Sequence, residues 1–266
     1  MLRLMCCMAH PDDETLGTGG IIARYTAEGI ETYLITATRG ERGWTGTPET
    51  DPGLQELGTI RTTELHNAAS VLGIKEVNFL DYLDGDLDQA DPEEATRKIV
   101  GHIRRIRPHV VITFDSFGAY GHPDHIAISQ LTTGAIVAAA SPDYMDEAQQ
   151  PPHQVQKLYF MAGTDEEGAV YEDAFGKLIM TIDGQDRGVV GWPSWSITTD
   201  IDTAAYWPQV WKAVQCHRSQ LSTYHVLENL SAEQHQQLWG QSAFYRVFSL
   251  VNGGRQVEDD LFAGLR

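Results

Sequence analysis

The chain has 266 residues, of which 42% are hydrophobic and 21% charged, a composition typical of a folded globular protein rather than a disordered one. No stretch approaches the roughly 18 consecutive apolar residues of a membrane span, and the N-terminus lacks the features of a secretory signal. The net charge of −18 disfavours nucleic acid and anionic membrane surfaces as partners, because both would be repelled. We therefore expect a cytoplasmic protein. Its cysteines, Cys6, Cys7 and Cys216, are then expected to be buried small hydrophobes rather than disulfides.

Apolar runs alternate with helical patterns along the first 140 residues. Strands are expected over 2–8, 31–38, 77–80 and 109–114, and helices over 16–28, 56–74, 92–107 and 123–140. Pro92 and Pro123 each stand where a proline is favoured, in the first turn of a helix. Four successive strand–helix units favour a three-layer α/β/α, Rossmann-like fold around a doubly wound, mostly parallel sheet.

The pattern changes after about residue 141. A loop is followed by an expected strand over 156–162, an irregular glycine-rich stretch over 163–195, a helix over 204–221 with Pro208 near its start, and a late strand over 243–251. We interpret this part as a lobe that completes the sheet and covers the site. The chain is then a single domain, 1–266, with a core over 1–140 and the lobe over 141–266. The role of 163–195 stays open.

Two polar segments follow the first and fourth expected strands. They are "AHPDDE" (9–14) and "DSFGAYGHPDH" (115–125), the parts of the chain richest in histidine and carboxylate. In a sheet of order 3-2-1-4-5, strands 1 and 4 are neighbours, and ligands bind in the crevice beyond their carboxyl ends. We therefore expect these two segments to face each other.

Two imidazoles and one carboxylate suit a divalent cation with an open position for water. His10, Asp13 and His125 are the candidate ligands, because a spacing of three lets a tight turn bring His10 and Asp13 to one side. Zinc is the favoured ion, although the same donors also describe Fe²⁺ sites. Asp12 then lies beside the cation, where a carboxylate can take a proton from an activated water.

The neighbouring polar residues have candidate roles as well. His122 is expected to act as the charged or proton-donating partner of an oxyanion or a leaving amine, with Asp124 orienting it or tuning its pKa. The structural alternative is that these pieces are turns and helix caps, with Asp12 or Asp13 capping the following helix. Two such motifs at adjacent strand ends are harder to explain as caps, so the metal interpretation is favoured.

The pair of motifs resembles the LmbE/PIG-L family of zinc-dependent N-deacetylases, over about residues 2–140. The supporting segments are "TRGERG" (38–43), "IRTTELHNAASVLGI" (60–74), "FLDYLDGDL" (79–87) and the late "HRSQ" (217–220). The resemblance implies the same metal ligands and the same base. The C-terminal half otherwise departs from anything that can be aligned, and substrate choice is expected to lie there.

The resemblance also adds residue roles. It implies Tyr120 as an oxyanion donor, and Arg61 and Asp84 as residues that hold the sugar. Arg61 has an alternative as a helix-surface charge, and Asp84 as a turn residue. For Glu14 we prefer a supporting role behind the ligands, or at the helix N-terminus, over catalysis.

The expected reaction is hydrolysis of an acetamide or related amide on an N-acetylglucosamine-type conjugate, a small-molecule partner. Two alternatives stay open: an amidase acting on a thiol–sugar S-conjugate or an antibiotic glycoside, and a non-catalytic sugar-binding module with a relic site. Whether the chain forms a homo-oligomer is also open. Four tryptophans in or near expected loops either stack on a sugar or pack within the lobe: Trp44, Trp192, Trp195 and Trp207.

Overall fold

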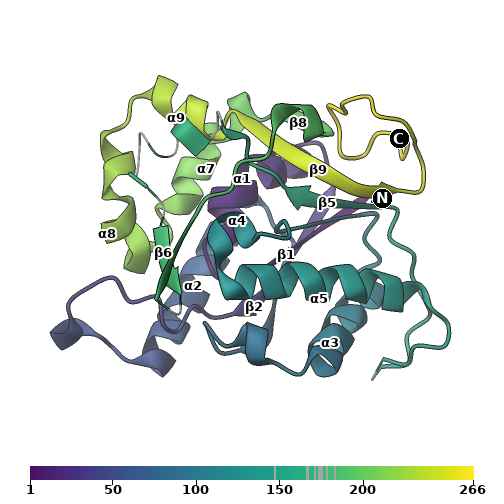
Figure 1. Ribbon diagram of the computed structural model, residues 1–266, viewed down its shortest axis with the longest axis horizontal. Coiled ribbons are helices and arrows are strands. Elements are labelled where there is room, and N and C mark those ends of the chain that lie inside the picture. Colours follow the sequence, from purple (N-terminus) through teal and green to yellow (C-terminus); the bar gives the residue numbers. More distant parts are fainter. Residues whose placement is uncertain (147, 166–167, 171, 173–175, 178, 183) are drawn as a thin grey trace.

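A seven-stranded sheet forms the centre of the protein in a computed structural model that describes all residues except 147, 166–167, 171, 173–175, 178 and 183 (Figure 1). The strand order is β3-β2-β1-β4-β5-β9-β8. The strands are β1 (Arg3–Met8), β2 (Glu31–Thr38), β3 (Glu76–Tyr82), β4 (Val110–Thr113), β5 (Lys157–Met161), β8 (Thr199–Asp202) and β9 (Gln241–Ser249). The first five are parallel, whereas β9 runs antiparallel to both β5 and β8. The expected order 3-2-1-4-5 is confirmed.

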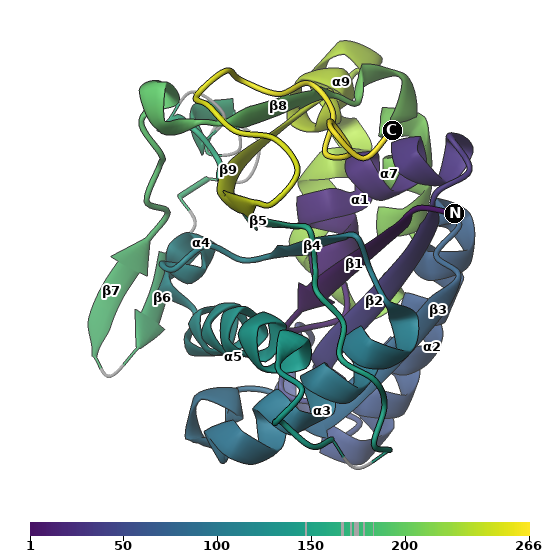
Figure 2. The ribbon, with the colours of Figure 1, turned by 90° about the vertical axis from the view of Figure 1, so that its right-hand side faces the viewer.

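Helices cover both faces of this sheet. They are α1 (Asp13–Ala27), α2 (Leu54–Leu72), α3 (Pro92–Ile106), α4 (Gly118–Gly121), α5 (Pro123–Ala140), α7 (Trp207–Val214), α8 (Leu221–Tyr224) and α9 (Ala232–Trp239). Helices α3 and α5 pack together on one face, and α1, α2 and α7 pack on the other (Figure 2). The three-layer, doubly wound architecture expected from the sequence is therefore confirmed.

Local sequence explains where several helices begin and end. Asp91 accepts hydrogen bonds from the backbone N–H groups of Glu93 and Glu94, and Pro92 occupies the first turn of α3. Gly73 ends α2 with a φ of 79°, a left-handed conformation that glycine adopts without a steric penalty. Prolines and caps thus set boundaries within a few residues of those expected.

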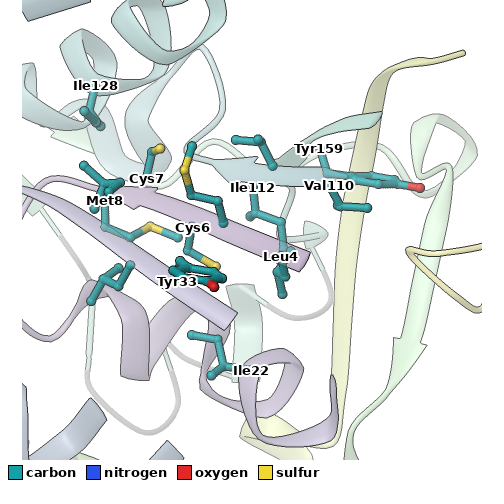
Figure 3. Packing of buried hydrophobic residues seen from close by; sticks show 14 of the residues in the cluster. Leu4, Cys6, Cys7, Met8, Ile22, Tyr33, Val110, Ile112, Ile128 and Tyr159 are labelled. Atoms are coloured by element: carbon teal, nitrogen blue, oxygen red, sulfur yellow. The ribbon is translucent and has the colours of Figure 1, made fainter. Parts of the chain in front are cut away.

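Strand β1 is the centre of the hydrophobic core. Leu4 to Met8 are each at most 1% exposed, and Cys6 packs among other buried side chains such as Ile112 (Figure 3). Cys6 pairs in register with Leu34 of β2 and Ile112 of β4. Burying side chains of this size stabilises the fold by about 1.5–3 kcal/mol each. Cys6 and Cys7 are buried free thiols, as expected, and burial raises the pKa of Cys7 to about 12. Strand β1 leads into the segment 9–14, and its two cysteines are inaccessible to solvent.

The C-terminal part differs from expectation in one element. The helix expected over 204–221 is wrong as a continuous helix: α7 ends at Val214, and short 3-10 turns occupy Ala204–Tyr206 and Arg218–Gln220. Leaving the helix after α7 allows His217 to become fully buried. The irregular stretch 163–195 contains a hairpin of β6 (Ile179–Ile182) and β7 (Gln185–Gly188), and some of its residues lie outside the described part. In the described part of the chain, no helix is long and apolar enough to cross a membrane.

Candidate active site

The segment after β1 turns sharply into α1. Asp12 has a φ of 106°, a left-handed conformation that costs a non-glycine residue about 1–3 kcal/mol. Its carbonyl accepts the N–H groups of Thr15 and Leu16, and its side chain makes no capping bond to α1. Asp13 turns back instead, so that its Oδ2 accepts the N–H groups of Ala9 and His10 at 3.1 and 2.7 Å. The Asp12 side chain therefore does not cap α1, and that alternative role is wrong.

Arg61 of α2 stabilises this turn by hydrogen bonds. Its guanidinium donates to the carbonyls of Pro11 and Gly40, and to Asp12 Oδ2 at 3.1 Å. The side chain is only 4% exposed, so the alternative of a helix-surface charge is wrong. A contact between Arg61 and the sugar stays a prediction.

The segment after β4 is fixed by Asp115. Its Oδ1 accepts the N–H groups of Phe117 and Ala119, and its Oδ2 accepts Trp192 Nε1–H at 2.7 Å. Gly118 has a φ of 62°, and a Cβ there would lie 2.9 Å from the Cβ of His125. This tight turn, followed by Pro123 at the start of α5, delivers His122 and His125 to the carboxyl edge of the sheet.

The three predicted ligands converge. His10 Nδ1 lies 3.2 Å from His125 Nε2 and 3.7 Å from Asp13 Oδ2, and Asp13 Oδ1 lies 3.6 Å from His125 Nε2. The two Asp13 distances involve different oxygens of its carboxylate. Each separation taken singly suits a pair of atoms that lie about 2.0–2.2 Å from a shared cation, and among the described residues the groups with one donor atom each within 4.8 Å of one another are completed by His122 or by Asp84 and Asp124. Burial, together with His10 and His122, lowers the pKa of His125 well below its usual range, which leaves the imidazole neutral. The donor set fits Zn²⁺ or Fe²⁺.

The far side of His10 meets two buried carboxylates. Asp84 Oδ1 and Asp124 Oδ2 each lie 3.1 Å from His10 Nε2, and Asp124 also accepts the N–H groups of Gly85 and Leu87. Carboxylates there favour a proton on Nε2, which leaves the Nδ1 lone pair for a cation. Burial lowers the pKa of His10, but the two carboxylates raise it to about 10. Asp84 is more than a turn residue.

Two further groupings of donors share His10. Within the described residues, His10, His122 and His125 place one donor atom each within 4.8 Å of one another, and so do His10, Asp84 and Asp124. The second set is the one that fixes the His10 proton. His122, which is only partly buried, thus lies in one cluster with the predicted ligands His10 and His125.

His122 presents a defined tautomer. Its Nδ1 accepts the backbone N–H of Asp124 at 3.1 Å, so a neutral His122 carries its proton on Nε2. Burial and the neighbouring His10 lower the pKa of His122 to about 4. Asp124 thus orients His122 through its backbone N–H, and its charge partly offsets the lowering of the His122 pKa, while its carboxylate contacts His10. The Tyr120 ring lies edge-on to His125 at 5.3 Å, and burial raises the pKa of its hydroxyl, which keeps it a hydrogen-bond donor.

His217 lies beside the site, although the sequence predicted no role for it. His217 Nε2 lies 2.9 Å from Glu14 Oε1, and both side chains are fully buried. The "HRSQ" motif, which contains His217, was the feature of the sequence that pointed to this residue.

The four tryptophans have different surroundings. Trp192 donates to Asp115, Trp44 donates to the Thr47 carbonyl, Trp207 stacks on His235, and Trp195 is 87% exposed.

Comparison with known proteins finds a matching family model and relatives that match most of the chain. A family model described as PIG-L, GlcNAc-PI de-N-acetylase, matches residues 5–136. A relative from Rhodococcus jostii, named 1D-myo-inositol 2-acetamido-2-deoxy-alpha-D-glucopyranoside deacetylase, is 34% identical over 99% of this chain and 98% of its own. A protein of the same name from Thermobifida fusca is 35% identical over 83% of this chain and 84% of its own. The fold and the paired motifs define a PIG-L-type α/β protein. This chain belongs to the PIG-L (LmbE) family.

Solved structures share the fold. A conserved protein of Thermus thermophilus matches with a TM-score of 0.68 and 28% identity, over 95% of this chain and 98% of that one. N,N'-diacetylchitobiose deacetylase from Pyrococcus horikoshii matches with a TM-score of 0.67 and 19% identity, over 92% of this chain and 83% of its own. A 4-carboxy-2-hydroxymuconate hydratase reaches 0.70 at 18% identity, covering 96% of this chain and 99% of that one. The same fold therefore serves more than one reaction, and the reaction must be argued from the site.

Proposed function

We propose that this protein is a metal-dependent N-deacetylase acting on a GlcNAc-type conjugate, with an inositol-linked N-acetylglucosamine as the first substrate to test. The observation that carries the proposal is the convergence of His10 Nδ1, Asp13 and His125 Nε2 within 3.2–3.7 Å, beside an Asp12 held in a left-handed turn. The names of the relatives that match nearly the whole chain support this choice of substrate. We also propose that residues 1–266 form one domain, since β9 and β8 extend the sheet that carries the site.

The cation would be held by His10, Asp13 and His125, where it would lower the pKa of a water and polarise the acyl carbonyl. Zinc is the ion we favour, with Fe²⁺ as the alternative. Asp12 is the proposed general base: its carboxylate takes a proton from the attacking water, while Arg61 fixes one of its oxygens at 3.1 Å. Asp84 and Asp124 keep the His10 proton on Nε2, away from the cation.

The opposite side of the site supplies donors. A neutral His122 offers Nε2–H, because its Nδ1 is taken up by the Asp124 amide, and Tyr120 offers its hydroxyl. Both suit an oxygen that gains negative charge as the amide carbon becomes tetrahedral. As the carbon–nitrogen bond breaks, the amine takes up the proton that Asp12 accepted, which returns Asp12 to its ionised form. Arg61 and Asp84 are the proposed sugar contacts.

The test measures free acetate released from the inositol-linked acetamide, from N-acetylglucosamine and from thiol–sugar S-conjugates. Chelation is expected to abolish release, and a single divalent ion per chain to restore it. Asp12→Asn should lower kcat about 10²–10⁴-fold, the range for loss of a general base. The matched control is Asp143→Asn, at an exposed position, which should retain full activity. Hydrolysis by Asp12→Asn at the wild-type rate would refute the assigned base. Failure of the protein to take up any metal on titration would refute the whole site.

A further inference from the structure

A buried pair of side chains joins the C-terminal lobe to the proposed base. Glu14, in the first turn of α1, accepts the backbone N–H of Asp12 on Oε2 at 2.9 Å. Its other oxygen, Oε1, meets the Thr15 hydroxyl and His217 Nε2, the latter at 2.9 Å. Glu14 and His217 are both 0% exposed. The carboxylate therefore spans the space between the backbone of the proposed base and a residue about two hundred positions further along the chain.

Burying these groups requires compensation. A carboxylate removed from water costs several kcal/mol unless its oxygens are hydrogen-bonded and a positive or donor group lies opposite. Glu14 meets this requirement with three donors, of which His217 is the only side chain from outside α1. Without the His217 donor, Glu14 would have to move toward another donor, and its bond to the Asp12 N–H would weaken.

The "HRSQ" motif, which contains His217, also contacts α2, the helix whose Arg61 bonds the Asp12 turn. The Ser219 backbone N–H and hydroxyl donate to Glu64 of α2 at 2.8 and 2.7 Å. Gln220 donates to the carbonyl of Gly43 at 2.8 Å. Glu64 lies one helical turn from Arg61, whose guanidinium bonds the Pro11 carbonyl and the Asp12 carboxylate. The lobe thus braces both helices that contact Asp12.

We propose that His217 is a positioning residue for Asp12, acting through Glu14 to hold the Asp12 backbone in its left-handed conformation. The proposal rests on the function proposed above, in which Asp12 is the base. With the N–H of Asp12 released, its φ of 106° is free to relax toward the ordinary negative range. That rotation turns the carboxylate away from the attacking water, while His10, Asp13 and His125 remain in place.

A matched pair of substitutions isolates the contact. His217→Gln places a side-chain N–H as many bonds from Cβ as His Nε2, whereas His217→Asn is one bond too short to reach Glu14. Both remove the ring. The control is His235→Asn, in the same lobe, where the buried ring stacks on Trp207 and Trp211 and bonds the Leu227 carbonyl.

We expect His217→Asn to lower kcat at least about tenfold with KM within about twofold and metal stoichiometry unchanged, since misplacing a reacting group acts on the chemical step. His217→Gln should recover most of the rate. His235→Asn should lower the melting temperature but leave kcat unchanged when assayed well below that temperature. Equal kcat in His217→Gln and His217→Asn, with both folded, would overturn the proposal.

Hydrogen exchange separates this proposal from the proposed reaction. The Asp12 amide should exchange slowly in the wild type and His217→Gln, and at least about tenfold faster in His217→Asn, because the opened bond no longer protects it. If no acetamide is hydrolysed but this exchange pattern holds, the reaction is wrong and the positioning contact stands. If the exchange of Asp12 is the same in all variants, the positioning contact is refuted whatever the activity.

Discussion

Replacing Arg61 with methionine tests how the strained turn at Asp12 is stabilised. The substitution keeps an unbranched apolar stem in α2 and removes only the guanidinium. Three hydrogen bonds are lost: to the carbonyls of Pro11 and Gly40, and to the Asp12 carboxylate at 3.1 Å. Because the side chain is 4% exposed, water cannot simply replace these donors.

The magnitude follows from these three bonds. Each buried carbonyl left without a donor costs about 1 kcal/mol or more, and breaking a buried charge pair costs about 3–5 kcal/mol. Because these effects are not additive, we expect Arg61→Met to reduce the free energy of unfolding by about 3–5 kcal/mol. A loss of that size corresponds to a lowering of the melting temperature by roughly 10 °C in a chain of this size.

Urea unfolding followed by circular dichroism measures this difference directly. The control is Arg105→Met in α3, where an exposed guanidinium pairs with Glu76, and the expected loss is at most about 1 kcal/mol. A loss below about 1 kcal/mol for Arg61→Met, similar to the control, would show that the guanidinium is not needed to hold the turn.

Two further predictions concern other parts of the molecule. Burial raises the pKa of Glu258, but Lys157, Tyr159 and Asn252 lower it to about 2, below the usual 4.5; its stabilisation is therefore complete above pH 4.5 and lost as the pH falls from 4.5 toward 2. Unfolding measured from pH 6 to pH 2.5 should show this loss, which Glu258→Gln should remove; an unchanged slope in the variant would contradict the assignment. Gly118→Ala should weaken metal uptake at least about tenfold, since a Cβ there would lie 2.9 Å from His125 Cβ at a φ of 62°. Gly101→Ala, with open space around it, is the control, and equal metal titrations for the two variants would argue against the role of this turn.

The core of the fold could be predicted because its information is local. Alternating apolar strands and capped helices predicted a doubly wound sheet, and the strand order 3-2-1-4-5 of that fold class then brought the segments after β1 and β4 together. That rule predicted that the two segments would face each other, and in the structure His10 Nδ1 and His125 Nε2 lie 3.2 Å apart although 115 positions separate the residues. The burial of Arg61 was not predicted, since its alternative as a helix-surface charge stayed open; Leu57 and Leu65, four positions to either side, are buried on the same helix face.

Other features depended on contacts that no local pattern encodes. The segment 204–221 has the composition of a helix, yet it breaks after α7 because burying His217 against Glu14 requires the chain to change direction. Asp124 was expected to orient His122 or tune its pKa, and its backbone N–H and charge do so; the contact of its carboxylate with His10 on the other segment was not predicted. Side-chain pairing between distant loops is set by the assembled fold.

The separation between Glu14 and His217 has a consequence for how the protein is made. All three proposed ligands lie within the first 125 residues, so they leave the ribosome early, whereas the partner of Glu14 follows 203 positions after it. At a translation rate of about 5–20 residues per second, this delay is about 10–40 s. From the synthesis of His125 until that of His217, the nascent chain carries all three donor side chains but not the contact that completes the turn at Asp12. Maturation of the site is therefore tied to the last third of synthesis, and a nascent chain stalled between these two histidines would contain every ligand without the aligned base.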